Sequence, residues 1–179
     1  MNIQTIKAAL FLFSFVFIQS TFAQTANEYL HGMNVEFDKI KNEYFDYINQ
    51  VAHGKSAKKA ESKRMEVLTT IKGSKNTISK MKGFNGSTTL RDSLISFLNL
   101  NYNVMANDYA KIMDLEAISE QSYDYMEAYI MAQDIANKKI DDGSKMVSAS
   151  VEVFAKANGI ELKESTDSRD RMLKIASSV

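Results

Sequence analysis

A Gly-Lys-Ser tripeptide at positions 54–56 is the segment that most directly suggests chemistry, because the same three residues end the phosphate-binding loop of nucleotide-binding proteins. That loop also requires a glycine where this chain has Asn49, and a β-strand where this sequence predicts a helix. We therefore interpret Gly54 as a left-handed C-cap and Ser56 as the N-cap of the next helix. Nucleotide binding is not expected.

Histidine and carboxylate residues do not form a metal motif in this sequence. A di-iron bundle uses two Glu-x-x-His motifs, whereas this chain has one, from Glu28 to His31. The other histidine, His53, has Gln50 three residues before it. The chain has no cysteine, which excludes a thiol nucleophile and zinc–thiolate or iron–sulfur sites, and no serine belongs to a recognisable catalytic motif. We expect no enzymatic activity and no cofactor.

Charge is balanced over the whole chain, with 22 basic and 22 acidic residues, but it is segregated along it. Residues 55–82 hold nine Lys or Arg against two Glu, and residues 108–142 hold nine acids against three Lys. If the two segments pack together, their opposite fields offset each other. If they do not, the basic face can bind an anionic glycan, a lipid headgroup or an acidic protein. The candidate contacts on this face are Lys55, Lys58, Lys59 and Lys63.

Nucleic acid is not an expected partner of that basic face. The segment 55–82 contains no aromatic residue on which a base could stack. Balanced charge over the whole chain also gives no general attraction to phosphate.

The pattern of apolar residues indicates long helices. The chain contains no proline, and apolar residues recur at spacings of three and four. The predicted elements are helices over 26–52 and 56–81, a loop over 83–87, a third helix from near Thr88 and a turn within 113–120. The turn is inferred from length, because a helix without it would far exceed the usual globular length. The seam of the first helix consists of Leu30, Met33, Phe37, Ile40, Tyr44, Tyr47 and Val51.

A fourth helix follows the turn, and Asp142, Gly143 and Ser144 suggest that it stops and restarts there. The first three helices have similar lengths, so they match one another as members of a bundle. We predict an all-α, antiparallel up-down bundle of about four long helices over residues 24–143.

Residues 144–179 are predicted to form a helical extension or hairpin, either projecting from the bundle or belonging to the same domain. A final helix is predicted over 165–178. The apolar Met146, Val147, Val151, Val153 and Phe154 then require cover from this C-terminal helix or from another chain. Of these, Val147, Val151 and Phe154 are candidates for partner binding or self-association.

Antiparallel folding also brings polar residues of the seams level with one another. Folding about residues 82–87 sets Arg64 level with the stretch from Met105 to Asp108, and folding near residue 117 sets Asn101 level with Gln133. We predict an Arg64–Asp108 ion pair and an Asn101–Gln133 contact, because unpaired buried polar groups are costly. The alternative is that these side chains extend to solvent.

Tyrosine is frequent near the predicted seams. The residues are Tyr44, Tyr47, Tyr102, Tyr109, Tyr123, Tyr125 and Tyr129. We interpret most of them as core residues whose hydroxyls reach the edge of the bundle. An exposed pair at Tyr123 and Tyr125 would instead favour a binding surface, because tyrosine is enriched at interfaces.

The first 23 residues have the organisation of a secretory signal peptide. The cation Lys7 precedes an apolar run over 8–18, and a short polar stretch closes with Ala23. The apolar run is shorter than the ~20 residues of a membrane-spanning helix, and no later segment is apolar enough to span a membrane. Without cysteine, no lipid can be attached at the cleavage site. We expect an exported, soluble protein of the cell surface or periplasm.

Three segments of the chain carry a family resemblance. They are Val51–Arg64, Leu90–Ser93 and Glu120–Tyr129. Together they resemble an uncharacterised family of bacterial surface proteins, of the type known from leptospiral surface lipoproteins. The resemblance implies an envelope or surface location and a binding role, with no active-site residue to carry over. This chain lacks the lipidated cysteine of those lipoproteins.

The sequence therefore predicts an exported, non-enzymatic helical protein that binds a macromolecular partner, either a protein or an anionic surface. Two alternatives stay open. One is a self-associating structural protein of the envelope, active as a homo-oligomer. The other is a metal-binding helical bundle.

Overall fold

The computed structural model describes residues 24–54 and 56–162 of the chain. Within these ranges the protein is an all-α helical bundle, which confirms the predicted fold class. The helices are α1 (Ala26–His53), α2 (Ala57–Lys80), α3 (Thr89–Asn103), η1 (Val104–Asp108), α4 (Tyr109–Glu116), η2 (Ser119–Gln121) and α5 (Tyr123–Ala157). The predicted signal peptide, Lys55 and the predicted helix over 165–178 lie outside the described residues.

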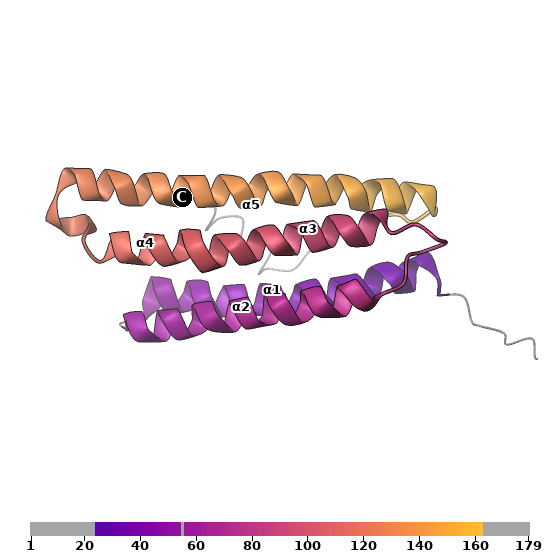
Figure 1. Cartoon of the computed structure of the whole chain (residues 1–179), viewed down its shortest axis with the longest axis horizontal. Coiled ribbons are helices and arrows are strands. Elements are labelled where there is room, and N and C mark those ends of the chain that lie inside the picture. The colour runs from indigo at the N-terminus through magenta and orange to yellow at the C-terminus, as the bar shows by residue number, and fades with distance from the viewer. Residues whose placement is uncertain (1–23, 55, 163–179) are drawn as a thin grey trace, which may run out of the picture.

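The bundle consists of two antiparallel hairpins packed against each other (Figure 1). In the first, α1 packs along α2. In the second, α3, η1 and α4 form one nearly continuous arm that packs along α5. Contacts between α2 and α3 join the hairpins, so the up-down order of the elements is as predicted.

Helix ends follow local residue chemistry. The α1 helix begins with a capping box, in which the Thr25 side chain accepts from the Glu28 amide and the Glu28 carboxylate accepts from the Thr25 amide. Ser56 caps α2 as predicted, by accepting from the Lys59 amide at 3.3 Å. The left-handed cap predicted at Gly54 is wrong, because its backbone is extended, with φ −81° and ψ 147°. Glycine is needed there for space, since a Cβ would lie 2.2 Å from the Gln50 carbonyl oxygen.

The predicted loops are present. Between α2 and α3, Asn85 and Gly86 adopt positive φ angles of 50° and 82°, and the Ser87 amide closes a turn on the Phe84 carbonyl. The turn predicted within 113–120 lies between α4 and α5, where η2 leads to the N-cap Ser122.

The predicted interruption at residues 142–144 is wrong, because α5 runs through them without a break. The reason is packing against α3. A Cβ at position 143 would lie 2.5 Å from Leu100 Cδ2 and 3.0 Å from Phe97 Cδ2. Gly143 therefore marks a close approach of two helices instead of a helix end. The chain from 144 to 157 belongs to the bundle.

The core is divided into three apolar clusters along the bundle. One joins α1, α2 and the α3–η1 arm around Ile71, Leu98 and Met105. A second joins α1, α3 and the last turns of α5. The third joins only the α3–η1–α4 arm and α5, around Val104, Ile112 and Ala136. The first half of α5 thus takes part in a core that excludes α1 and α2.

No helix among the described residues is long and apolar enough to cross a membrane.

Candidate functional site

Part of the basic face of α2 forms ion pairs within the chain. The Lys63 ammonium lies 2.7 Å from the Glu66 carboxylate and 3.8 Å from that of Asp46 on α1. Lys58 and Lys59 are exposed in the first turn of α2. Of the two alternatives for this segment, packing along the acidic segment does not hold for most of its length, since α2 packs mainly against α1 and α3.

The predicted Arg64–Asp108 ion pair is also wrong, although the predicted register is correct. The buried Arg64 guanidinium donates to the Met105 carbonyl oxygen at 2.6 Å and to the Glu61 carboxylate of its own helix at 2.7 Å. Asp108 instead pairs with Lys139 of α5, at 2.7 Å. Asp108 therefore stabilises the contact with α5. Arg64 is bound instead by a backbone carbonyl within the π-helical turn η1.

The predicted Asn101–Gln133 contact is replaced by two other contacts. Asn101 is buried on the side of α1, where its amide oxygen accepts from the Tyr44 hydroxyl at 3.4 Å and its amide nitrogen donates to the Phe97 carbonyl. Gln133 donates to the Tyr129 hydroxyl at 2.8 Å, one turn away on α5. Each amide therefore finds a closer partner than the one predicted.

The predicted partner-binding residues Val147, Val151 and Phe154 are covered within the chain. They pack against the cluster that contains Leu30 and Leu90, and the Phe154 ring lies 5.7 Å from Tyr29 and 5.3 Å from Phe84. The proposed need for a second chain at these residues is wrong, because α1 and α3 supply the cover.

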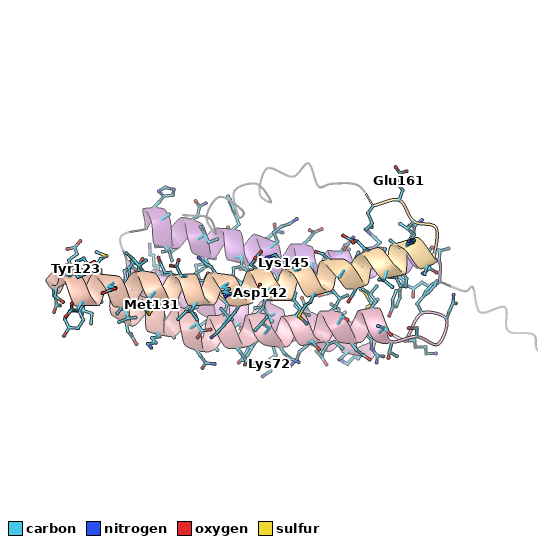
Figure 2. All side chains as sticks on the ribbon, turned by 90° about the horizontal axis from the view of Figure 1, so that it is seen from above. Lys72, Tyr123, Met131, Asp142, Lys145 and Glu161 are labelled. Atoms are coloured by element: carbon cyan, nitrogen blue, oxygen red, sulfur yellow. The ribbon has the colours of Figure 1, made fainter. Side chains whose placement is uncertain are left out.

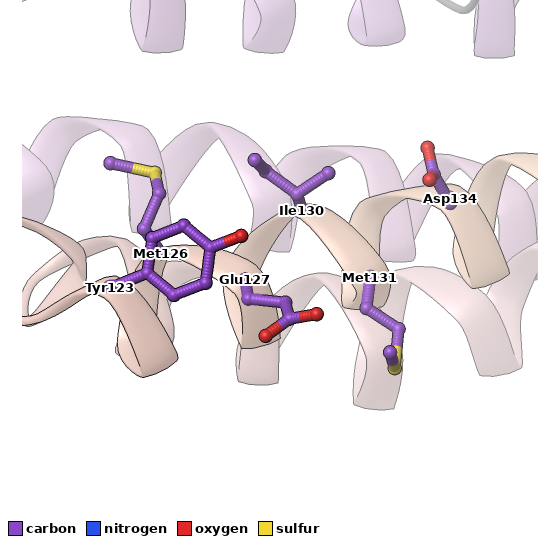
Figure 3. Close-up of a pocket in the computed structure, with 6 residues that line it drawn as sticks. All are labelled: Tyr123, Met126, Glu127, Ile130, Met131 and Asp134. Carbon is purple, nitrogen blue, oxygen red and sulfur yellow. The ribbon is translucent and has the colours of Figure 1, made fainter.

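The opposite end of α5 carries an exposed apolar surface. We define the α5 stripe as Tyr123, Met126, Ile130 and Met131, which recur at helical spacing on one face. Tyr123 is 81% exposed, Ile130 49% and Met131 56%. Together with Glu127 and Asp134, these four side chains line a shallow depression of about 290 Å³ (Figure 3). Tyr125 and Ile135, on the same turns of α5, are also exposed.

The other face of the same turns is occupied by the core. Tyr129, Ala132, Ala136 and Ile140 pack against Val104 and Ile112 of the α3–η1–α4 arm. The first half of α5 therefore has two apolar faces, and the described part of the chain covers one of them. An exposed apolar row of this kind is typical of an interaction site.

The charge around the α5 stripe has one sign. Between Lys111 and Lys138 the chain holds six acidic residues and no Lys, Arg or His. They are Asp114, Glu116, Glu120, Asp124, Glu127 and Asp134. Burial, with a smaller contribution from the negative charge of Glu116, raises the pKa of Tyr129 on the covered face. The stripe thus lies in a negative field.

A second shallow depression lies where α1 meets the start of α2. It is lined by polar residues that include Asp46, His53 and Lys63. The Gly-Lys-Ser segment adjoins it, but α1 stands where a phosphate-binding loop requires a strand. Glu28 is used by the capping box and His31 is exposed, so the single Glu-x-x-His motif has a structural explanation. In the described part of the chain, no three His, Asp or Glu side chains are placed to hold a metal ion.

Comparison of the chain with family models, curated proteins and solved structures finds no match. The resemblance to the leptospiral surface-lipoprotein type therefore stays a prediction.

The α5 stripe was only partly predicted from the sequence. Exposure of Tyr123 and Tyr125 was the alternative to a core position, and both side chains are exposed. Ile130 and Met131 were missed. The available signal was a second apolar row at the same helical spacing, offset by one residue from the core row that contains Tyr129.

Proposed function

We propose that the protein is an exported, non-enzymatic helical module that binds a macromolecular partner through the α5 stripe. The observation that carries the proposal is the exposure of Tyr123, Ile130 and Met131 on one face of a helix whose opposite face is buried. An apolar row costs free energy in water, and a partner that covers it recovers that cost.

The shape of the surface supports a macromolecular partner over a small molecule. Small-molecule sites are usually deep and bury most of the ligand. The depression on α5 is shallow and lies on a single helix (Figure 3). From Tyr123 to Asp134 the depression extends ~17 Å along the helix axis, enough for the side of another polypeptide.

The binding proposal is tested by comparing which polypeptides are retained by the wild-type chain, a stripe variant and a control variant. In the stripe variant, Ile130→Ser and Met131→Ser are combined. In the control variant, Met146→Ser and Val153→Ser remove two apolar side chains of the same helix that are 69% and 70% exposed. We expect immobilised wild-type and control chains to retain the same polypeptide, identified by mass spectrometry, and the stripe variant to lose it. Equal retention by all three chains would exclude the stripe.

Export rests on the organisation of the first 23 residues. We expect the mature chain to begin at Gln24, as measured by mass spectrometry of the protein purified from the cells that make it. An N-terminus at Met1 would contradict export by a cleaved signal peptide.

A further inference from the structure

We propose that the partner of the α5 stripe is a basic amphipathic helix that lies along α5 with its apolar side on the stripe. The inference rests on the proposed function and adds the chemistry of the ligand. Two observations support the inference: the shape of the exposed apolar row and the negative charge around it.

The shape of the row fits the side of a helix. Tyr123, Met126 and Ile130 are spaced by three and four residues, so they form a straight row with Met131 beside it. A second helix packed in this way buries residues at the same spacing over about three turns. Glu127 and Asp134 stand in the wall of the same depression, seven residues apart on one side of α5 (Figure 3).

The sign of the charge selects a basic partner. Glu127 and Asp134 are both exposed, and within residues 24–54 and 56–162 neither carboxylate forms an ion pair. The nearest cations along the chain are Lys111 and Lys138, outside the acidic segment. Lys or Arg residues that flank the apolar side of a partner helix would be attracted to these carboxylates.

The same charge disfavours other occupants. Helices that lie on anionic membranes present Lys and Arg to the lipid, and nucleic-acid sites neutralise phosphate with the same residues. The α5 stripe presents carboxylates. A second copy that docked stripe to stripe would bring the two acidic segments together, which opposes the contact.

The basic helix α2 of a second copy is a poor match as well. Its exposed surface carries Lys58, Lys59 and the apolar Met65. At helical spacing from Met65 lie Ser62 and Thr69, both polar, so α2 offers no apolar row to cover the stripe. The occupant we infer is therefore a helix of another polypeptide.

Two synthetic peptides test this inference on the full mature chain. Each has 18 residues with leucine along one helical side, and the remaining positions are lysine in one peptide and glutamate in the other. We expect the lysine peptide to bind at least about tenfold more tightly than the glutamate peptide, as measured by fluorescence anisotropy. Equal affinity of the two peptides would overturn the inference.

Variants locate the charge effect. Glu127→Gln with Asp134→Asn should weaken binding of the lysine peptide about fivefold, because both carboxylates line the depression. The control, Glu152→Gln with Glu161→Gln, changes the net charge equally at exposed positions away from the stripe, and should change the affinity less than about twofold. Equal weakening by both pairs would reduce the effect to net charge and contradict a specific site.

Hydrogen exchange and vesicle binding distinguish a basic helix from two other occupants of the stripe, a second copy of the chain and a lipid surface. The lysine peptide should protect amides within residues 123–135. Slower exchange of these amides at high than at low protein concentration without peptide, with a dimer in light scattering, would identify a second copy as the occupant. Binding to phosphatidylglycerol vesicles that the stripe variant abolishes would identify a lipid surface. Either result overturns the inference.

The two proposals fail in different ways. If the stripe variant loses its retained polypeptide but the peptides do not differ in affinity, the binding surface stands and the basic helix is wrong. If the stripe variant and the control variant retain the same polypeptide equally, the binding surface itself is wrong.

Discussion

The two halves of α5 both carry apolar residues at helical spacing, but their surroundings differ. In the last turns, Val147, Val151 and Phe154 are covered by α1 and α3. In the first turns, Tyr123 and Met131 are exposed, and the α3–η1–α4 arm packs on the opposite face. Figures 1 and 2 show that the Tyr123 end of α5 extends past the ends of α1 and α2.

This overhang follows from helix length. The α5 helix has 35 residues, whereas α1 has 28 and α2 has 24. Since each residue adds ~1.5 Å, α5 exceeds α1 by roughly 10 Å. Whether an apolar row becomes core or surface is therefore decided by the number of helices present at that level of the bundle.

Truncation of one apolar residue in each half should have the largest effect on stability. We expect Phe154→Ala to lower the free energy of unfolding by about 3 kcal/mol, because it removes a ring packed on Tyr29 and Phe84. Ile130→Ala should change it by less than about 0.5 kcal/mol. Urea denaturation followed by circular dichroism measures both. A loss for Ile130→Ala as large as that for Phe154→Ala would show that the stripe is part of the core.

Removal of Arg64 should have the next largest effect. We expect Arg64→Ala to cost about 2 kcal/mol, because the Met105 carbonyl loses a charge-assisted hydrogen bond at a buried position. Lys145→Ala, which removes an exposed pair with Asp141, should leave the stability almost unchanged. Thermal unfolding of the two variants compares them. An Arg64→Ala chain as stable as Lys145→Ala would contradict the buried role of the guanidinium.

Alanine at two glycines should give effects of opposite sign. Gly143→Ala places a methyl group 2.5 Å from Leu100, and we expect a net loss of about 1 kcal/mol after the gain in helix propensity. Gly73→Ala in α2 meets no atom within 4 Å and should gain about 0.5–1 kcal/mol. The midpoints of urea unfolding measure the difference. Stabilisation by both substitutions would show that α3 and α5 are not in close contact at Gly143.

Alkaline pH should separate the covered tyrosines from the exposed ones. Burial raises the pKa of Tyr47 above its ordinary value of 10.0, so the folded state holds this proton more tightly than the unfolded chain. The associated stability is present below pH 10 and is lost as the pH rises further. We expect Tyr47→Phe to move alkaline unfolding to higher pH, as followed by circular dichroism. Tyr123→Phe, at an exposed position of the α5 stripe, should leave the transition unchanged.

The fold could be predicted because helix ends and seams have local causes. Ser56, the Asn85–Gly86 loop and the apolar seam of α1 from Leu30 to Tyr47 all indicate the structure that forms. Val51, predicted to belong to the same seam, is 40% exposed. The role of Gly143 could not be predicted from the sequence, since glycine is common both at helix ends and where two helices pack closely. Because Gly143 was interpreted as a helix end, the predicted fourth helix had about the same length as the other three. A helix of that length does not extend past α1 and α2, so the exposed end of α5 was not predicted.

The sequence predicts which residues of neighbouring helices lie level with one another, but not which polar groups bond to each other. Folding about the 82–87 loop places Arg64 beside Met105, as observed. The acceptor is a backbone oxygen in a π-helical turn, and a periodic apolar pattern does not indicate such a turn. Hydrogen-bond partners depend on this local backbone geometry.

The central claim is that the first half of α5 is a binding surface, and photo-crosslinking in the cells that make the protein tests it most directly. A photoreactive residue is placed at Met131 on the stripe or at Met146, an exposed position on the same helix beyond it. The account predicts a crosslinked product with another polypeptide from position 131 and none from position 146. Products from both positions alike, or from neither, would contradict it.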